Sequence, residues 1–161
     1  MKNKEQNKLK GLTLLETLVY VALFSIILFV IINFVLGTQE STRRNSQRSS
    51  VYQSAQFLKQ HLDYSFQKVI LVNEGGSVLN NDNGKLTLVF SDTSKSYTIL
   101  NNRIYFNDIA ITPKNISATK LHFEPIYSKK GVIMAIKVST KLVSKKDPKI
   151  FEEITYLAVI R

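Results

Sequence analysis

The sequence contains no cysteine, and only three prolines and six glycines among its 161 residues. Without cysteine, the chain has neither a disulfide framework nor a thiolate metal site. If it is exported, its folded domain must hold together by packing alone. No proline interrupts residues 13–72, so nothing in that stretch forces a helix to end.

Catalytic and metal-binding patterns are also missing from the sequence. It has two histidines, and no HExxH, GxSxG or CxxC spacing. His61 is predicted to lie on the polar side of an amphipathic helix, and His122 alternates outward between two apolar neighbours. Both are interpreted as surface residues. We therefore expect no enzymatic activity, no cofactor and no metal site.

One glycine-containing run resembles an ion-binding loop without meeting its requirements. A P-loop at Gly84-Lys85 would need Ser or Thr in place of Leu86. The run Asn80–Gly84 resembles a calcium loop in composition, but its ligand positions supply no carboxylate. A polar turn is the preferred interpretation.

Positive charge is in excess. The chain has 22 lysines and arginines against 12 aspartates and glutamates, a formal net charge of +10. Such an excess favours anionic partners, among them DNA, acidic polymers and lipid headgroups. It selects none of them, and a soluble basic surface is the simpler interpretation.

Two groups of basic residues are candidates for anion contact. Arg43, Arg44 and Arg48 follow an apolar run, where they would meet lipid headgroups or acids of neighbouring subunits. The second group is predicted to lie on a C-terminal hairpin: Lys129, Lys130, Lys137, Lys141, Lys145, Lys146 and Lys149. Within it, Lys145, Lys146 and Lys149 are the candidate anion contacts, with DNA as an unproven partner. We favour the simpler interpretation that these lysines protect an edge strand from aggregation.

What the sequence does contain is one long apolar run, Leu12–Leu36, after a basic leader of residues 1–11. As a helix, its 25 residues would be about 37 Å long, enough to cross the roughly 30 Å apolar layer of a membrane. Glu16 is its only residue that is charged at neutral pH. A carboxylate in such surroundings is costly, so we expect it to have a cationic partner.

Cleavage after Gly11 would supply that cation, because Leu12 would then carry a free α-amine. A neighbouring helix staggered by about one turn would place its amine beside Glu16. In a medium of low dielectric constant the two charges would be strongly coupled.

The stretch from Gly11 to Val19, GLTLLETLV, resembles the N-terminal signature of type IV prepilins. A basic leader, a glycine, an apolar run and a lone acid coincide, although Leu12 stands where the family usually has phenylalanine. The resemblance implies that a prepilin peptidase cuts after Gly11 and methylates Leu12, and that Glu16 acts in assembly.

The same resemblance implies a structural subunit, a minor pilin or pseudopilin, of a type IV pilus, a type II secretion filament or a DNA-uptake filament. Among these we favour a likeness to the J-type pseudopilin of type II secretion. The implied partners are the prepilin peptidase, other pilin or pseudopilin subunits, an inner-membrane assembly platform and the membrane. The chain would cross the cytoplasmic membrane once, N-terminus inside, and then join a cell-surface or periplasmic filament.

Three alternatives stay open. An ordinary signal peptide would be cut after Gly37, and a generic membrane anchor would leave Glu16 unexplained. The third is a secreted or signal-anchored basic protein that binds DNA or another anionic polymer.

After Gly37 the apolar residues Val51, Ala55, Leu58, Leu62, Phe66 and Val69 recur at steps of three or four. That spacing predicts a helix. We expect one continuous helix whose first half, residues 12–36, is apolar and whose second half, residues 37–72, is amphipathic.

From Leu86 onward the apolar residues alternate with polar ones, which predicts strands. The strands are expected at 86–90, 97–100, 103–106, 121–123, 132–143 and 150–160, with a tight turn at Asn101-Asn102 and a final antiparallel hairpin. The predicted fold is α+β: a long N-terminal helix packed on an antiparallel sheet of residues 73–161, as in pilins.

Overall fold

The computed structural model describes residues 14–160 and divides the chain into two compact units. The first unit reaches Arg43, and the second begins at Arg44. Helix α1 (Leu14–Phe66) contributes to both, and every strand of the described chain belongs to the second unit.

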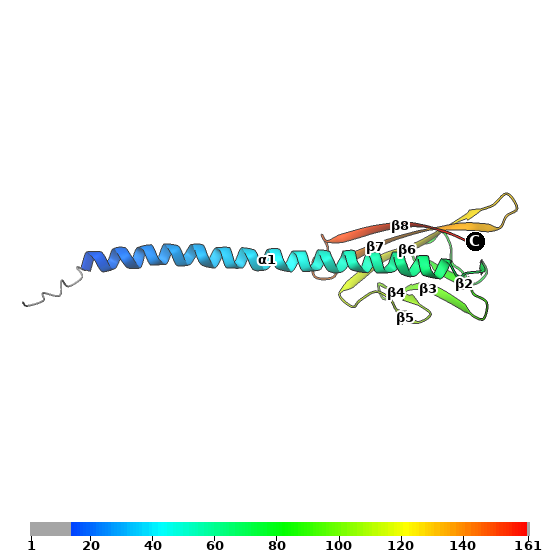
Figure 1. Cartoon of the computed structure of the whole chain (residues 1–161), viewed down its shortest axis with the longest axis horizontal. Helices are drawn as coiled ribbons and strands as arrows, with labels where there is room; N and C mark the ends of the chain where they lie inside the picture. Colours follow the sequence, from blue (N-terminus) through cyan, green and yellow to red (C-terminus); the bar gives the residue numbers. More distant parts are fainter. Residues whose placement is uncertain (1–13, 161) are drawn as a thin grey trace, which may run out of the picture. The chain divides into compact units, whose positions relative to one another are not determined.

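The strands form two antiparallel sheets (Figure 1). The first sheet contains, in order, β1 (Leu71–Val72), β2 (Lys85–Val89), β3 (Ser94–Leu100), β4 (Arg103–Phe106) and β5 (Ile109–Ala110). The second contains β6 (Ile116–Tyr127), β7 (Ile133–Ser144) and β8 (Phe151–Val159). The predicted α+β architecture and the final hairpin, β7 with β8, are confirmed. The single sheet that we expected is in fact two.

The helix ends at Phe66, six residues before the predicted end at 72. Leu71 and Val72 instead form β1, where they pair with Val89 and Leu88 of β2. The run from Val69 to Val72 is rich in β-branched residues, which suit a pleated strand better than a helix. Pairing with β2 therefore decides the conformation of this stretch.

Positive backbone φ angles mark the two tight turns of the first sheet. Asn101 and Asn102 have φ of 49° and 57°, so the predicted turn between β3 and β4 is confirmed. Asn107 and Asp108, with φ of 48° and 67°, make a second such turn into β5, which the sequence analysis missed. Asparagine and aspartate tolerate this region because their short side chains bond locally.

The core of the second unit lies where the later part of α1 meets both sheets (Figure 1). The predicted helical stripe is buried along its whole length: Val51, Ala55, Leu58, Leu62, Phe66, and Val69 just past the helix. From the sheets, Tyr97, Ile104, Phe123 and Ile136 are fully buried against it. The stripe is what positions α1 on the sheets.

Candidate functional site

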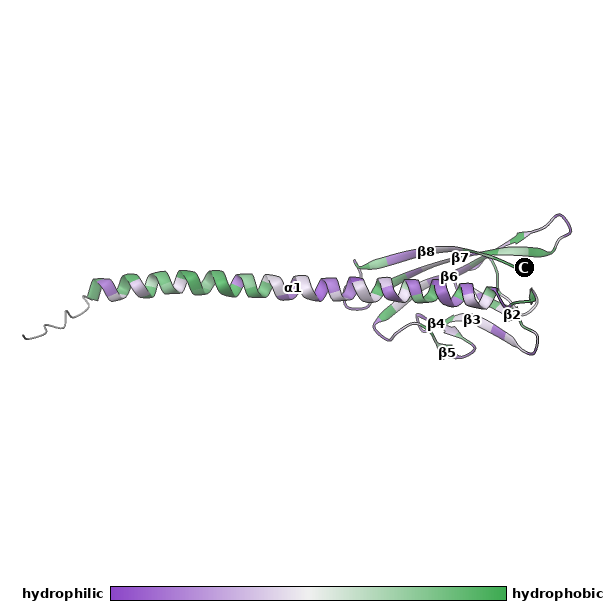
Figure 2. Cartoon of the chain, in the orientation of Figure 1, coloured by the Kyte–Doolittle hydropathy of each residue, from purple (hydrophilic) through white to green (hydrophobic). Residues whose placement is uncertain are grey.

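Figure 2 shows that the first part of α1, from Leu14 to Leu36, is mostly hydrophobic. Every residue of this stretch is exposed. Within the described residues, α1 is the one helix long and apolar enough to cross a membrane. We call Leu14–Leu36 the apolar segment. Exposed apolar surface of this extent marks a site of contact with lipid or with another protein.

The polar side chains in the apolar segment bond to the helix that carries them. Thr17 Oγ1 donates to Leu14 O at 2.8 Å, Ser25 Oγ to Val21 O at 2.7 Å, and Asn33 Nδ2 to Phe29 O at 2.9 Å. An unpaired polar group is costly in hydrocarbon, and these bonds reduce that cost. The segment is therefore suited to surroundings without water.

Glu16 lies in the first turn of α1. A carboxylate there is stabilised by the positive end of the helix dipole. Tyr20, one turn later, donates its hydroxyl to Glu16 Oε1 at 3.2 Å, an orienting contact that the sequence analysis did not identify. The predicted cleavage and methylation residues, Gly11 and Leu12, lie outside the described residues.

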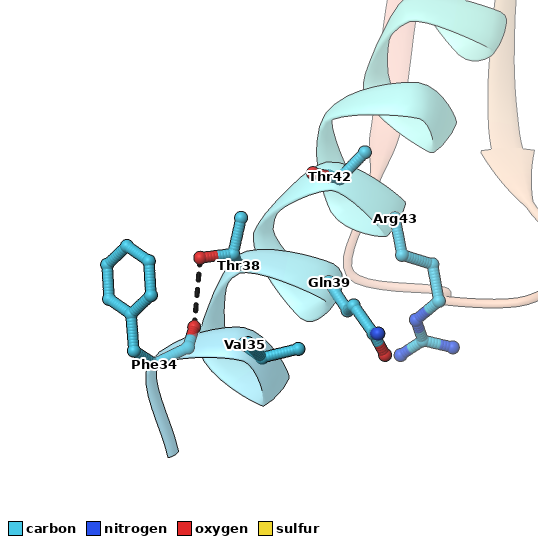
Figure 3. Close-up of a pocket in the computed structure, with 6 residues that line it drawn as sticks. All are labelled: Phe34, Val35, Thr38, Gln39, Thr42 and Arg43. Atoms are coloured by element: carbon cyan, nitrogen blue, oxygen red, sulfur yellow. Dashed lines mark hydrogen bonds between the residues drawn. The ribbon is translucent and has the colours of Figure 1, made fainter. Parts of the chain in front are cut away.

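An open hollow on α1 marks the end of the apolar segment (Figure 3). It is lined by Phe34, Val35, Thr38, Gln39, Thr42 and Arg43. The hydroxyl of Thr38 donates to Phe34 O at 2.9 Å, and Arg43 pairs with Glu40 at 2.9 Å. Both side chains bond to residues of the same helix. The hollow therefore lies where the helix surface changes from apolar to polar, and these two side chains do not form a catalytic pair.

The two lysines of β7 are paired with carboxylates. Lys137 Nζ lies 3.0 Å from Glu124 Oε2, and Lys141 Nζ lies 3.1 Å from Glu153 Oε1. Because β7 is the central strand of its sheet, they do not protect an edge. The edge-protection interpretation is therefore wrong for Lys137 and Lys141. The strands on either side of β7 supply the glutamates that pair with these lysines.

The remaining lysines of the predicted group lie at two ends of β7. Lys145, Lys146 and Lys149 are exposed in the loop to β8, and Lys129 and Lys130 are exposed in the turn that precedes β7. The 12 residues of β7 separate the two sets by about 40 Å, at about 3.3 Å per residue. The predicted lysine group is therefore not one patch.

His61 is half-buried rather than a surface residue, which corrects the prediction. Its Nδ1 lies 2.7 Å from the hydroxyl of Tyr97, and its ring lies 4.8 Å from that of Phe106. Burial lowers the pKa of His61 and raises that of Tyr97. The spacing of the apolar residues along the helix predicted that His61 would lie on the polar face. That spacing could not reveal that the sheet covers this face at His61.

His122 alternates with buried neighbours as predicted, but like His61 it is half-buried rather than a surface residue, and its Nδ1 lies 3.0 Å from Asp82 Oδ1. Residues 14–160 contain no group of three or more His, Cys, Asp or Glu side chains able to hold a metal ion.

No known protein family, curated protein or solved structure matches this chain. Two surfaces of different chemistry are candidate functional sites. One is the apolar segment with Glu16 in its first turn, and the other is the exposed lysine loop between β7 and β8.

Proposed function

We propose that this chain is a structural filament subunit of the type IV pilin kind, a minor pilin or pseudopilin. One observation carries the proposal: among the described residues, α1 presents an exposed apolar segment with one carboxylate, Glu16, in its first turn. A plain anchor needs the apolar surface but has no use for the acid. A subunit that pairs charges with its neighbour needs both.

The apolar segment would have two successive environments. It first crosses the membrane, N-terminus inside, with lipid on all sides. It then packs among the same segments of neighbouring subunits. Neither environment contains water, so the transfer changes the hydration of the segment little. Internal bonding of Thr17, Ser25 and Asn33 serves the segment equally in both.

Glu16 would select the neighbour. Cleavage after Gly11 frees the amine of Leu12, and the amine of one subunit would meet Glu16 of the next. The hydroxyl of Tyr20 on Oε1 orients the carboxylate for that contact. Removing one charge of a pair buried in a filament leaves the other uncompensated, which costs about 3–5 kcal/mol.

The strand-bearing unit would stay outside the filament axis and carry contacts specific to the system. The proposal covers a type IV pilus, a type II secretion filament and a DNA-uptake filament, with the J-type pseudopilin as the favoured relative. It assigns the chain no catalytic step.

The first experiment expresses the chain together with a prepilin peptidase and measures the mass of its N-terminus. We expect a product that begins at Leu12 and carries one methyl group. A product that begins at Thr38 would instead support a signal peptide. An uncut chain that still inserts into the membrane would support a plain anchor.

The second experiment compares Glu16→Gln with Glu40→Gln in filaments purified from the native host. Glu40 is a fitting control because it pairs with Arg43 beyond the apolar segment. We expect Glu16→Gln to be inserted and cleaved normally but to be at least tenfold depleted in filaments, while Glu40→Gln is incorporated. Equal incorporation of both variants would contradict the pairing of Glu16.

A further inference from the structure

Three parts of the second unit that are distant in sequence meet at one end of it. Asn115, in the turn before β6, accepts a hydrogen bond from Lys145 N at 3.0 Å. Its Nδ2 donates to Ser50 Oγ of α1 at 2.9 Å. Ser144, at the end of β7, bonds to Gln47 of α1 at 3.2 Å. The start of α1 in this unit, the turn at 113–115 and the loop at 145–149 are therefore neighbours.

Each of the three parts carries exposed cations. We call the group the basic end: Arg44, Arg48, Lys114, Lys145, Lys146 and Lys149. Arg48 and Lys149 line one hollow together with two aromatic side chains, Tyr52 and Phe151. The structure thus joins two groups that are about 100 residues apart in the sequence.

Acids at the basic end are few. Asp147 accepts a hydrogen bond from the backbone N of Lys149 at 3.1 Å, and Glu152 lines the hollow with Arg48. Among residues 14–160, none of the five cations from Arg48 to Lys149 in this group forms an ion pair. They differ in this from Lys137 and Lys141, which are neutralised by neighbours.

The covalent chain limits how far Arg44, the first residue of the basic end, can lie from Leu36 at the end of the apolar segment. Only eight residues lead from Leu36 to Arg44, and even a fully extended chain of that length spans at most about 29 Å. A helical connection of the same length spans about 12 Å. Lys129 and Lys130, at the other end of the 12-residue strand β7, are about 40 Å further along the sheet.

We propose that the basic end docks on the phosphate headgroups of anionic lipids while the apolar segment crosses the membrane. Juxtamembrane lysines and arginines are attracted to anionic lipid within a Debye length of its surface. An amphipathic aromatic side chain such as Tyr52 favours the same interfacial layer. The docked state would hold the strand-bearing unit on the membrane surface until the apolar segment leaves the bilayer. The inference needs a membrane-crossing segment and is independent of filament assembly.

The test uses the full, uncleaved chain in lipid nanodiscs. Because the chain has no cysteine, Pro148→Cys in the lysine loop gives a unique site for a fluorescent label. A quencher on the lipid headgroups reports docking, in discs with phosphatidylglycerol and in discs with phosphatidylcholine alone. We expect stronger quenching in the anionic discs, and loss of the difference at high salt.

The variant K145Q/K146Q/K149Q should weaken docking about fivefold per lysine, and so on the order of a hundredfold in total. The matched control, K129Q/K130Q, removes two exposed lysines at the far end of β7 and should dock like the unchanged protein. Circular dichroism checks that both variants keep the fold.

Two results would overturn the proposal. One is equal quenching in the two kinds of disc. The other is tight binding of a labelled DNA duplex that is lost in K145Q/K146Q/K149Q, without any dependence on lipid charge, which would assign the loop to nucleic acid. Failure of Glu16→Gln to affect filaments would leave this test untouched, because the nanodiscs hold single, uncleaved subunits.

Discussion

Gly84 lies at the junction of the two sheets, where loop 80–84 meets β6. Its backbone N donates to Leu121 O at 2.9 Å, and the residue is buried. A Cβ on Gly84 would lie 2.7 Å from Leu121 O and 2.8 Å from Phe123 Cδ2. Gly84 therefore allows the backbone of loop 80–84 to pack closely against β6. This packing explains the glycine that the sequence analysis considered for a phosphate or calcium loop.

Gly84→Ala should destabilise the second unit by about 1–3 kcal/mol, since the added methyl group meets a fixed carbonyl and a core ring. Urea unfolding of the full chain in micelles, followed by circular dichroism, measures the loss. Gly75→Ala is the control, because a Cβ there meets only Asn73 Oδ1 at an ordinary 3.7 Å. Equal midpoints for the two variants would contradict the close approach at Gly84.

His61 makes the stability of the unit depend on pH. Burial lowers its pKa, so the folded state favours the neutral ring. The unfolded chain then binds the proton more readily, and stability rises with pH there. The contribution is present above the unfolded pKa of about 6.5 and is lost as pH falls below it.

We expect the urea concentration at the unfolding midpoint to decrease when the pH is lowered from about 7 to about 5. His61 should account for less than about 1 kcal/mol of the lost unfolding free energy, because its ring is only half-buried. His61→Gln should flatten this part of the profile. A profile unchanged by His61→Gln would assign the pH dependence to carboxylates.

At the scale of the element, α1 is one continuous helix whose two parts differ in surface chemistry. Its described first part is exposed and apolar up to Leu36, and its later part buries a stripe against the sheets. Gly37, between the two, has no atom within 4 Å of its would-be Cβ, and the helix passes through it unbroken. Packing therefore holds only the later part of α1.

Leu58→Ala should cost about 2–5 kcal/mol, because Leu58 is 1% exposed and its loss leaves a cavity in the core. Phe57→Ala, at a residue 49% exposed, removes a larger side chain from outside the buried stripe and should cost under about 1 kcal/mol. Thermal unfolding of both variants in micelles provides the comparison. Similar losses for the two would show that the stripe does not carry the contact with the sheets.

At the scale of the whole molecule, the apolar segment should keep the chain in a membrane. Val21→Arg with Ile27→Arg places two charges within the segment, each costing about 2.5–3.5 kcal/mol for insertion. We expect the double variant to be released by alkaline carbonate washing, while the unchanged chain stays with the membrane fraction. Gln53→Arg with Gln60→Arg adds the same charge at exposed positions of the later helix and should not be released.

Local patterns predicted most of the fold. The steps of three or four from Val51 to Phe66 predicted the helical stripe, and alternation predicted β2, β3, β4, β6, β7 and β8. The two-residue strands β1 and β5 were missed because a period cannot be recognised in two residues. Their conformation depends on a partner strand, which local pattern does not reveal.

The candidate site was predicted unevenly. Glu16 stood out because a lone charge in an apolar run is visible in the sequence, whereas Tyr20 did not, since its bond to Glu16 depends on rotamer and helix phase. Lys145, Lys146 and Lys149 are exposed, but the seven lysines grouped from the sequence do not form one patch. The partners of Lys137 and Lys141 lie on neighbouring strands and could not be assigned without the register.

By itself the sequence determined the apolar run, the place of its single acid and the periods of helix and strand, because these depend on residues a few positions apart. Only the tertiary structure decided that Tyr97 meets His61, that Gly84 meets Leu121, and that the lysine loop joins the first turns of α1 in the second unit. Each of these contacts joins residues more than 30 positions apart, so it follows from how the sheets and α1 pack together.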